Sequence, residues 1–125
     1  MDVTSFDHTK EVINEIARDF NGRLDIFVAN AGIPWTQGRM IDGELSHYRN
    51  VVSTDLDSVF YCAKAAGEIF RKQYESDGVN MMGEKMKNYR YGSFIATASM
   101  SGHIANIPNH QSAVRISSTT VAILG

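Results

Sequence analysis

Two short apolar runs, each followed directly by small residues, constrain the fold of this chain more than any other feature. The first run, Leu24-Asp-Ile-Phe-Val28, continues into a small-residue turn that ends at Gly32. The second lies in Gly92-Ser-Phe-Ile-Ala-Thr-Ala-Ser99-Met-Ser-Gly102, where small hydroxyl-bearing residues follow the apolar ones. Such runs are typical of buried parallel strands, and open α/β sheets bind ligands at the carboxyl edge of these strands. The sequence therefore predicts an α/β fold with polar groups collected at one edge of a sheet.

A first helix is predicted over residues 9–20, where apolar residues recur at helical spacing. Ser5 or Asp7 would be its N-cap, and Asn21-Gly22 would end it. Asp2-Val3, just before this helix, reads as the end of a strand.

A second and much longer helical pattern runs from Glu44 to about Tyr74. Its apolar face extends from Leu45 to Phe70, and we expect a bend at Asp55-Leu-Asp-Ser58. A polar loop over 75–91 then leads into the second apolar run. The resulting order of strand end, helix, strand, long helix and strand predicts a βαβαβ unit with right-handed crossovers and a parallel sheet.

Length, charge and cysteine content narrow the class of protein. The 125 residues form one domain at most, and the net charge of −2 at pH 7 gives no reason to expect nucleic acid or a membrane surface as a partner. No apolar run is long enough to span a membrane, and the acidic N-terminus is unlike a signal peptide. The single cysteine, Cys62, lies in an apolar helical stretch, where we expect it to pack. One cysteine suits a reducing compartment, so we expect a cytoplasmic protein.

The Asn30-Ala31-Gly32 turn and the Ser99-bearing strand resemble, in order, spacing and flanking residues, those of the short-chain dehydrogenase/reductase family. The resemblance implies a Rossmann-type, doubly wound parallel sheet of about seven strands. Residues 1–113 would be the central βαβαβ portion of this dinucleotide-binding domain, without the glycine-rich phosphate loop. The segment 99–103 is most similar to the fungal branch of NADP-dependent mannitol dehydrogenases and sorbose reductases. That branch implies interconversion of ketoses or other carbonyls with polyols or alcohols.

The resemblance also implies a site for NADP or NAD, made by two segments. Asp2 would hold the adenine ring with its carboxylate, and Val3 would hold it with its backbone amide. The second segment is the turn made of Ala29, Asn30, Ala31 and Gly32. Its small side chains would let the backbone approach a ribose, and its glycine permits a tight turn. The ordinary alternatives are an exposed N-terminal dipeptide and a plain strand-to-loop turn.

The catalytic residues that the resemblance implies are Ser99 and Asp55. Ser99 would hydrogen-bond the substrate oxygen, and Ser101 lies close to it in the sequence. Asp55 stands where the family has an Asn that anchors a proton-relay water, and an ionised carboxylate can accept but cannot donate. A packed strand-end serine and a helix-surface aspartate are the alternatives. His103 and His110 lack metal-ligand spacing with any other His, Cys or acidic residue, so we predict no metal.

The Tyr and Lys that the family carries on the next helix are missing. The matching positions are Val114 and Ser118. A phenol has a free pKa of about 10, and a neighbouring ammonium lowers that pKa so that the phenol can transfer a proton near neutral pH. Because neither Val nor Ser can do this, we expect this chain to be inactive. We also set residues 114–125 apart as an aberrant tail unlike the family.

A second hypothesis belongs to another class of protein. The chain would be a non-catalytic interaction module that docks on full-length subunits through the long helix over 44–74, and the same helix could support a homo-oligomer. Two or three parallel strands leave sheet edges unpaired. We therefore expect the isolated chain to fold poorly, with Phe27, Val28, Phe94 and Ile95 uncovered.

The abrupt change after Ala113 predicts how the tail arose. The sequence follows the family up to Ala113 and departs from it at the next residue, whereas gradual divergence would spread over neighbouring positions. Because Val114-Arg115 can be encoded by a stretch that begins with GT, as fungal introns do, we expect an unspliced intron after codon 113. Sequencing the genomic DNA should show that removal of the intron restores a frame that begins with Tyr and has Lys four residues later. A downstream region that encodes no such helix in any frame would contradict this origin.

Overall fold

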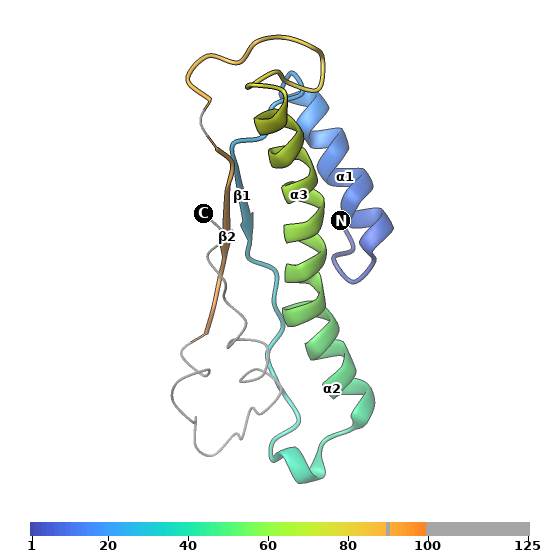
Figure 1. Cartoon of the computed structure of the whole chain (residues 1–125). Helices are drawn as coiled ribbons and strands as arrows, with labels where there is room; N and C mark the ends of the chain where they lie inside the picture. Colours follow the sequence, from blue (N-terminus) through green and yellow to red (C-terminus); the bar gives the residue numbers. More distant parts are fainter. Residues whose placement is uncertain (90, 100–125) are drawn as a thin grey trace.

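A computed structural model describes residues 1–89 and 91–99 (Figure 1). In chain order, its elements are α1 (Phe6–Asp19), β1 (Ile26–Ala29), the 3₁₀ turn η1 (Met40–Asp42), α2 (Leu45–Val52), the π-helical turn η2 (Ser53–Asp57), α3 (Ser58–Glu75) and β2 (Ser93–Ala96). The two strands of this part of the chain pair in parallel, and α3 lies beside them with α1 packed against it. The predicted α/β class with a parallel sheet is confirmed.

Local sequence signals set the ends of α1. The backbone N–H of His8 donates to Ser5 Oγ at 3.4 Å, which makes Ser5 the N-cap. At the other end, Asn21 and Gly22 have positive φ angles of 58° and 73°, the left-handed conformation that commonly ends a helix. The prediction of this helix is therefore confirmed, with its start at Phe6 rather than residue 9.

The predicted strand end at Asp2-Val3 is wrong. The Asp2 carboxylate instead accepts two hydrogen bonds from Thr4, one from the backbone N–H at 2.9 Å and one from the hydroxyl at 2.7 Å. Such local bonds give the backbone an alternative to a strand ladder. The described order is therefore helix, strand, long helix and strand, and residues 2–3 pair with neither β1 nor β2.

The long helical pattern over 44–74 is one continuous helical path through α2, η2 and α3, and the predicted bend falls on the π-helical turn η2. The π-helical turn changes which residues face the core. The buried positions of α3 are Ser58, Cys62, Ala65, Ala66, Ile69 and Gln73, and that of α2 is Val51. Leu45 and Phe60, which the sequence put on the apolar face, are 70% and 64% exposed. A single helical phase could not predict this face, because a π turn shifts the phase within the helix.

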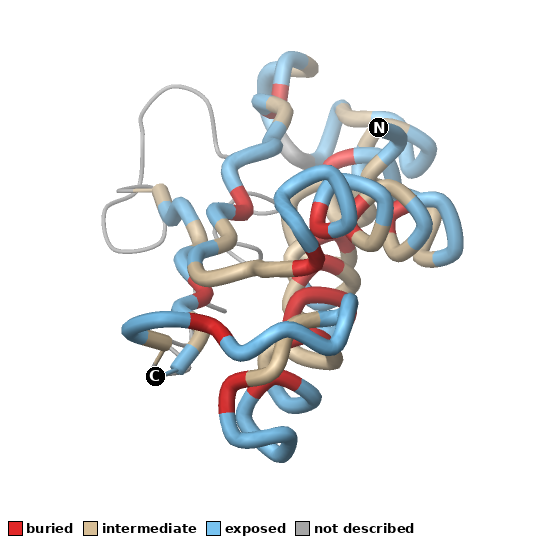
Figure 2. The backbone as a smooth tube through the Cα atoms, turned by 90° about the horizontal axis from the view of Figure 1, so that it is seen from above, coloured by how far each residue is buried: buried red, intermediate tan, exposed pale blue. Residues whose placement is uncertain are grey.

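The core lies between the helices and one face of the sheet, and Figure 2 shows buried positions recurring along the helices. Phe27 and Phe94 stack on this face with ring centroids 5.8 Å apart, and they pack against α3. The expectation that these two residues would be uncovered is therefore wrong, because α3 covers them. It holds for Val28 and Ile95, which alternate to the opposite face and are 53% and 50% exposed.

A buried glutamine joins the end of α3 to the start of the sheet. Gln73 is almost fully buried, and its side-chain amide makes two hydrogen bonds to the backbone of Leu24. Leu24 N–H donates to Gln73 Oε1 at 2.9 Å, and Gln73 Nε2 donates to Leu24 O at 2.7 Å. The side chain therefore replaces the neighbouring strand that this backbone segment would otherwise need.

Two glycines give a matched test of the packing. At Gly92 a Cβ atom would collide with the Phe70 ring, whereas at Gly67 nothing lies within 4 Å of the Cβ position. We expect Gly92→Ala to destabilise the chain by about 1–3 kcal/mol through overpacking. We expect Gly67→Ala, inside α3, to stabilise it by about 1 kcal/mol through helix propensity. Urea unfolding followed by circular dichroism measures both changes, and an equal effect of the two substitutions would contradict this packing.

Candidate functional site

The carboxyl ends of the two strands meet at the turn that the sequence singled out. Beyond the last ladder pair, Ala29–Ala96, the backbone N–H of Thr97 donates to Ala29 O at 2.9 Å. The Thr97 hydroxyl donates to Asn30 Oδ1 at 2.7 Å. The turn after β1 and the segment that leads to Ser99 are therefore joined, although they are 67 residues apart in the chain.

Asp55 reaches the same turn from the middle of the long helix. The backbone N–H of Ile33 donates to Asp55 Oδ1 at 2.8 Å, and a Cβ atom added at Gly32 would lie 3.5 Å from that oxygen. The side chain comes from the π-helical turn η2, and such turns frequently lie at functional sites. The structure thus brings Asp55 together with the end of the Ala29–Gly32 turn, as the site hypothesis requires.

Burial makes the ionised form of the Asp55 side chain less favourable than it is in water. Burial raises the pKa of Asp55 above its ordinary value, and the hydrogen bond from Ile33 partly offsets this rise. Within residues 1–89 and 91–99, Ile33 is its only hydrogen-bond donor. In the ionised state Asp55 can anchor the turn and accept from a water molecule, but it cannot donate a proton.

Ser99 is the last described residue, half-buried and two positions beyond Thr97. It follows β2, at the same end of the parallel sheet as the Asn30 turn that follows β1. The assignment of Ser99 as a catalytic residue remains a prediction. The remaining residues of that hypothesis, at 101, 103, 110, 114 and 118, lie outside the described part of the chain.

The other predicted cofactor segment is placed differently. The bonds from Thr4 lower the pKa of the Asp2 carboxyl and already occupy one of its oxygens. The backbone oxygen of Asp2 also accepts from the Thr9 hydroxyl at 3.4 Å. No described hydrogen bond joins Asp2 or Val3 to the Ala29–Gly32 turn, so the role of this dipeptide in binding adenine stays a prediction.

The loop after the turn is closed by a tryptophan that sequence reasoning left unassigned. Trp35 is buried, and its indole N–H donates to Gly38 O at 2.8 Å. Its ring lies 4.9 Å from that of His47, and the backbone N–H of Thr36 donates to His47 Nε2 at 3.2 Å. Trp35 also packs with Val51 of α2. The loop therefore closes on α2, and the only sequence signal was an aromatic residue three positions before a glycine.

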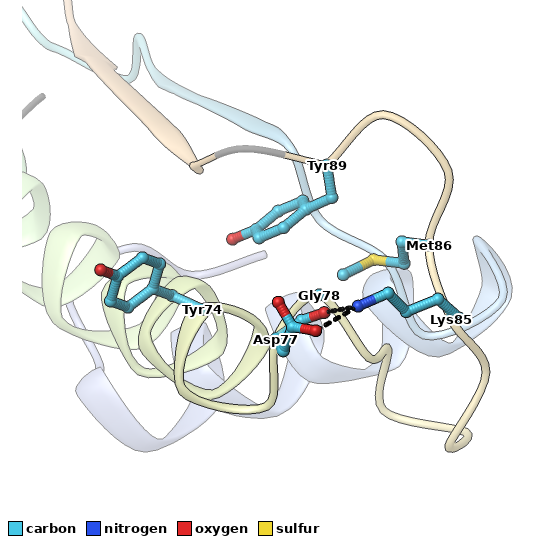
Figure 3. A pocket seen from close by; sticks show the side chains of 6 residues that line it. All are labelled: Tyr74, Asp77, Gly78, Lys85, Met86 and Tyr89. Atoms are coloured by element: carbon cyan, nitrogen blue, oxygen red, sulfur yellow. Dashed lines mark hydrogen bonds and ion pairs between the residues drawn. The ribbon is translucent and has the colours of Figure 1, made fainter.

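Two hollows lie away from the carboxyl edge. A small pocket of about 170 Å³ lies beside the C-terminal end of α3 (Figure 3). It is lined by Tyr74, Asp77, Gly78, Lys85, Met86 and Tyr89. Lys85 Nζ lies 2.6 Å from Asp77 Oδ2 and lowers the pKa of that carboxyl. A mostly apolar groove of about 460 Å³ runs along β1 near the end of α1. Neither hollow is lined by a predicted catalytic or cofactor-binding residue.

The described residues hold neither a metal-ligand cluster nor a membrane-spanning helix. Within residues 1–89 and 91–99, no three His, Cys, Asp or Glu side chains are grouped as metal ligands. In the same part of the chain no helix is both long and apolar enough to cross a membrane. Cys62 is buried in the core, as predicted, and burial raises the pKa of its thiol.

Comparison with known proteins identifies the family. A family model described as enoyl-(acyl carrier protein) reductase matches residues 1–121. A short-chain type dehydrogenase/reductase from Mycobacterium marinum superposes with a TM-score of 0.75 at 33% identity, over 94% of this chain and 40% of that one. The chain belongs to the short-chain dehydrogenase/reductase family. The resemblance seen in the sequence, and the Rossmann-type fold that it implied, are thereby confirmed.

Curated relatives fall in the branch that the sequence indicated. An L-xylulose reductase from Hypocrea jecorina is 49% identical over 121 residues, which are 97% of this chain and 42% of the relative. A probable NADP-dependent mannitol dehydrogenase from Yarrowia lipolytica is 48% identical over 110 residues, or 87% of this chain and 34% of that protein. The chain thus spans less than half the length of these relatives. The family match reaches residue 121, inside the segment 114–125, and the origin of that segment remains a prediction.

The raised pKa of Asp55 predicts an unusual pH dependence. Because the folded state holds the Asp55 proton more tightly than the unfolded state, its contribution to stability is present at low pH and is lost as pH rises through the folded pKa. Asp55→Asn keeps an acceptor for Ile33 and removes the charge. We expect it to be more stable than the wild type at pH 7 by about 0.5 kcal/mol, a small gain because solvent screens a partly exposed carboxylate.

Asp55→Ala is the control, because it removes the acceptor and should cost about 1 kcal/mol. The measurement is the difference in free energy of unfolding between each variant and the wild type at several pH values. That difference cancels the opposite pH dependence of other carboxyls such as Asp2 and Asp77. Equal destabilisation by Asn and Ala at pH 7 would contradict the prediction.

Proposed function

We propose that this chain is the central part of an NADP-dependent oxidoreductase that interconverts ketoses or related carbonyls with polyols or alcohols. The observation that supports this most is the joining of the Ala29–Gly32 turn to the strand end before Ser99. That arrangement places a backbone turn of small residues next to the Thr97 hydroxyl at the carboxyl edge of a parallel sheet, where such folds bind ligands. The names of the two fungal relatives supply the substrate class and the preference for NADP.

The residues at this edge fit a dinucleotide cofactor. The turn carries alanine side chains and Gly32, so its backbone is open to a ribose, and Asn30 is exposed. We assign the cofactor contacts to Ala29, Asn30, Ala31 and Gly32. The bound nicotinamide would supply or accept hydride.

Ser99 and Asp55 would serve the reaction in different ways. The Ser99 hydroxyl would donate a hydrogen bond to the substrate carbonyl oxygen, where negative charge develops as hydride arrives. Asp55 would hold the turn through Ile33 and accept from a water molecule, without donating a proton itself. The positions that match the acid–base Tyr and Lys of the family hold Val114 and Ser118, which cannot transfer the proton, so we propose that the chain is inactive by itself.

A non-catalytic interaction module remains the second candidate, and the surface of the long helix favours it. Leu45, Tyr48 and Phe60 are exposed apolar or aromatic side chains on α2 and α3. Exposed groups of this kind are typical of surfaces that meet another protein. In this hypothesis the chain is a cytoplasmic protein that docks on full-length subunits of its own family.

An activity assay tests the proposal. We expect the chain to oxidise NADPH at the background rate with L-xylulose, fructose or sorbose, because loss of the general acid alone removes about 10²–10⁴ in rate. The full-length L-xylulose reductase relative, assayed in parallel, is the positive control. Turnover of this chain close to that of the control would contradict the inactivity. Failure of NADPH, at millimolar concentration, to shift the amide resonances of Ala31 and Gly32 would contradict the cofactor site.

A further inference from the structure

Thr97 is fastened to the turn after β1 at two points. Its backbone N–H donates to Ala29 O at 2.9 Å, which extends the strand ladder by one residue. Its hydroxyl donates to Asn30 Oδ1 at 2.7 Å. The first bond fixes the position of Thr97 against β1, and the second therefore acts on Asn30 from a fixed point.

The hydroxyl bond decides how the Asn30 side chain is oriented. In an asparagine side chain, the acceptor oxygen and the donor nitrogen are bonded to the same carbon. Rotation about one bond therefore orients both atoms together. Because Thr97 donates to the oxygen, the Nδ2 group is directed away from Thr97. Among residues 1–89 and 91–99, no acceptor makes a hydrogen bond with Asn30 Nδ2. The two N–H donors of an exposed asparagine are thus held in one direction at the carboxyl edge of the sheet.

The alternation along the strands places both side chains on the same face. Asn30 follows Ile26 and Val28 at even spacing, and Thr97 follows Ser93 and Ile95. That face carries the exposed side chains of the sheet, opposite to α3. The fixed donors therefore lie where a ligand can reach them without displacing the core.

We propose that Thr97 is a positioning residue that holds the Asn30 amide so that Nδ2 donates to a hydroxyl oxygen of a ribose-bearing ligand. The identity of the ligand rests on the proposed function, whereas the fixing of the amide does not. A hydroxyl is required at position 97, and the methyl group of threonine is not.

The first experiment needs no ligand. Side-chain ¹⁵N relaxation of the Asn30 amide is measured in the 125-residue chain, in Thr97→Val and in Thr97→Ser. Valine keeps the shape and removes the donor, while serine keeps the donor. We expect an order parameter for Asn30 Nδ2 that is high in the wild type and T97S, and that falls below about 0.6 in T97V. An equally ordered amide in T97V would overturn the proposal, and so would a mobile amide in the wild type.

The second experiment titrates NADPH into the same proteins and follows the Asn30 side-chain resonances. We expect T97V to bind NADPH about three- to tenfold more weakly, as loss of one hydrogen bond implies, and T97S to bind like the wild type. In an Asn30→Ala background, T97V should have no further effect, because Thr97 acts through Asn30. An effect of T97V that persists in N30A would overturn the positioning role.

The two experiments separate this inference from the proposed function. If NADPH shifts no resonance of the wild type, the dinucleotide site and the ligand named here are both wrong, while relaxation still decides whether Thr97 fixes the amide. If NADPH binds but Asn30 Nδ2 does not respond, the proposed function survives and the donor role is overturned. Should T97V fail to fold, Thr97→Ala gives the same comparison, because alanine also removes the hydroxyl donor and leaves Asn30 in place.

Discussion

The two hydrogen bonds between the Gln73 side chain and the Leu24 backbone are the contact on which the rest of the structure depends. Gln73 lies near the end of α3, and Leu24 lies just before β1. An amide that is almost completely buried must satisfy both its donor and its acceptor, and here a single backbone residue satisfies both. The register between the long helix and the sheet is therefore fixed at one end, and the packing of Phe27 and Phe94 against α3 follows from it.

The opposite end of the same helix–sheet layer forms the candidate site. Asp55 meets the turn after β1 because η2 projects it toward Ile33, and Thr97 meets the same turn because β2 runs parallel to β1. The site is therefore assembled from three segments that lie far apart in sequence. Asp55 accepts one hydrogen bond from the end of the turn and Thr97 donates two to it, so a shift of either segment would change the shape of the turn.

The sequence could predict those features that depend on neighbouring residues. Ser5 caps α1 and Asn21-Gly22 ends it through contacts within a few residues, and the strands were visible as apolar runs that lead into small residues. The Ala29–Gly32 turn could be singled out for the same reason, since its composition alone gives an open backbone.

Features that depend on distant partners could not be predicted in this way. Gln73 reads as a polar residue on a helix until Leu24 is placed beside it, and Thr97 reads as a strand residue until Asn30 is known to face it. The buried face of α3 was misjudged because the π turn shifts the helical phase, and a periodic pattern carries no signal for such a shift. The prediction of a strand end at Asp2-Val3 was wrong because hydrogen bonds from Thr4 to the Asp2 carboxylate compete with strand pairing.

The outer face of the sheet changes in character along its length. Apart from Ser93, the face is apolar from its amino end to its middle, where it carries Ile26, Val28 and Ile95. Asn30 and Thr97 make it polar at its carboxyl end. A protein segment packed over this face would gain free energy by burying the apolar side chains, and it would lose free energy by burying the Asn30 amide and the Thr97 hydroxyl. We therefore expect a segment packed on this face to end between Val28 and Asn30. The part of the face beyond Val28 then stays accessible to small polar molecules. The side chains of the strands thus set the boundary of the binding edge.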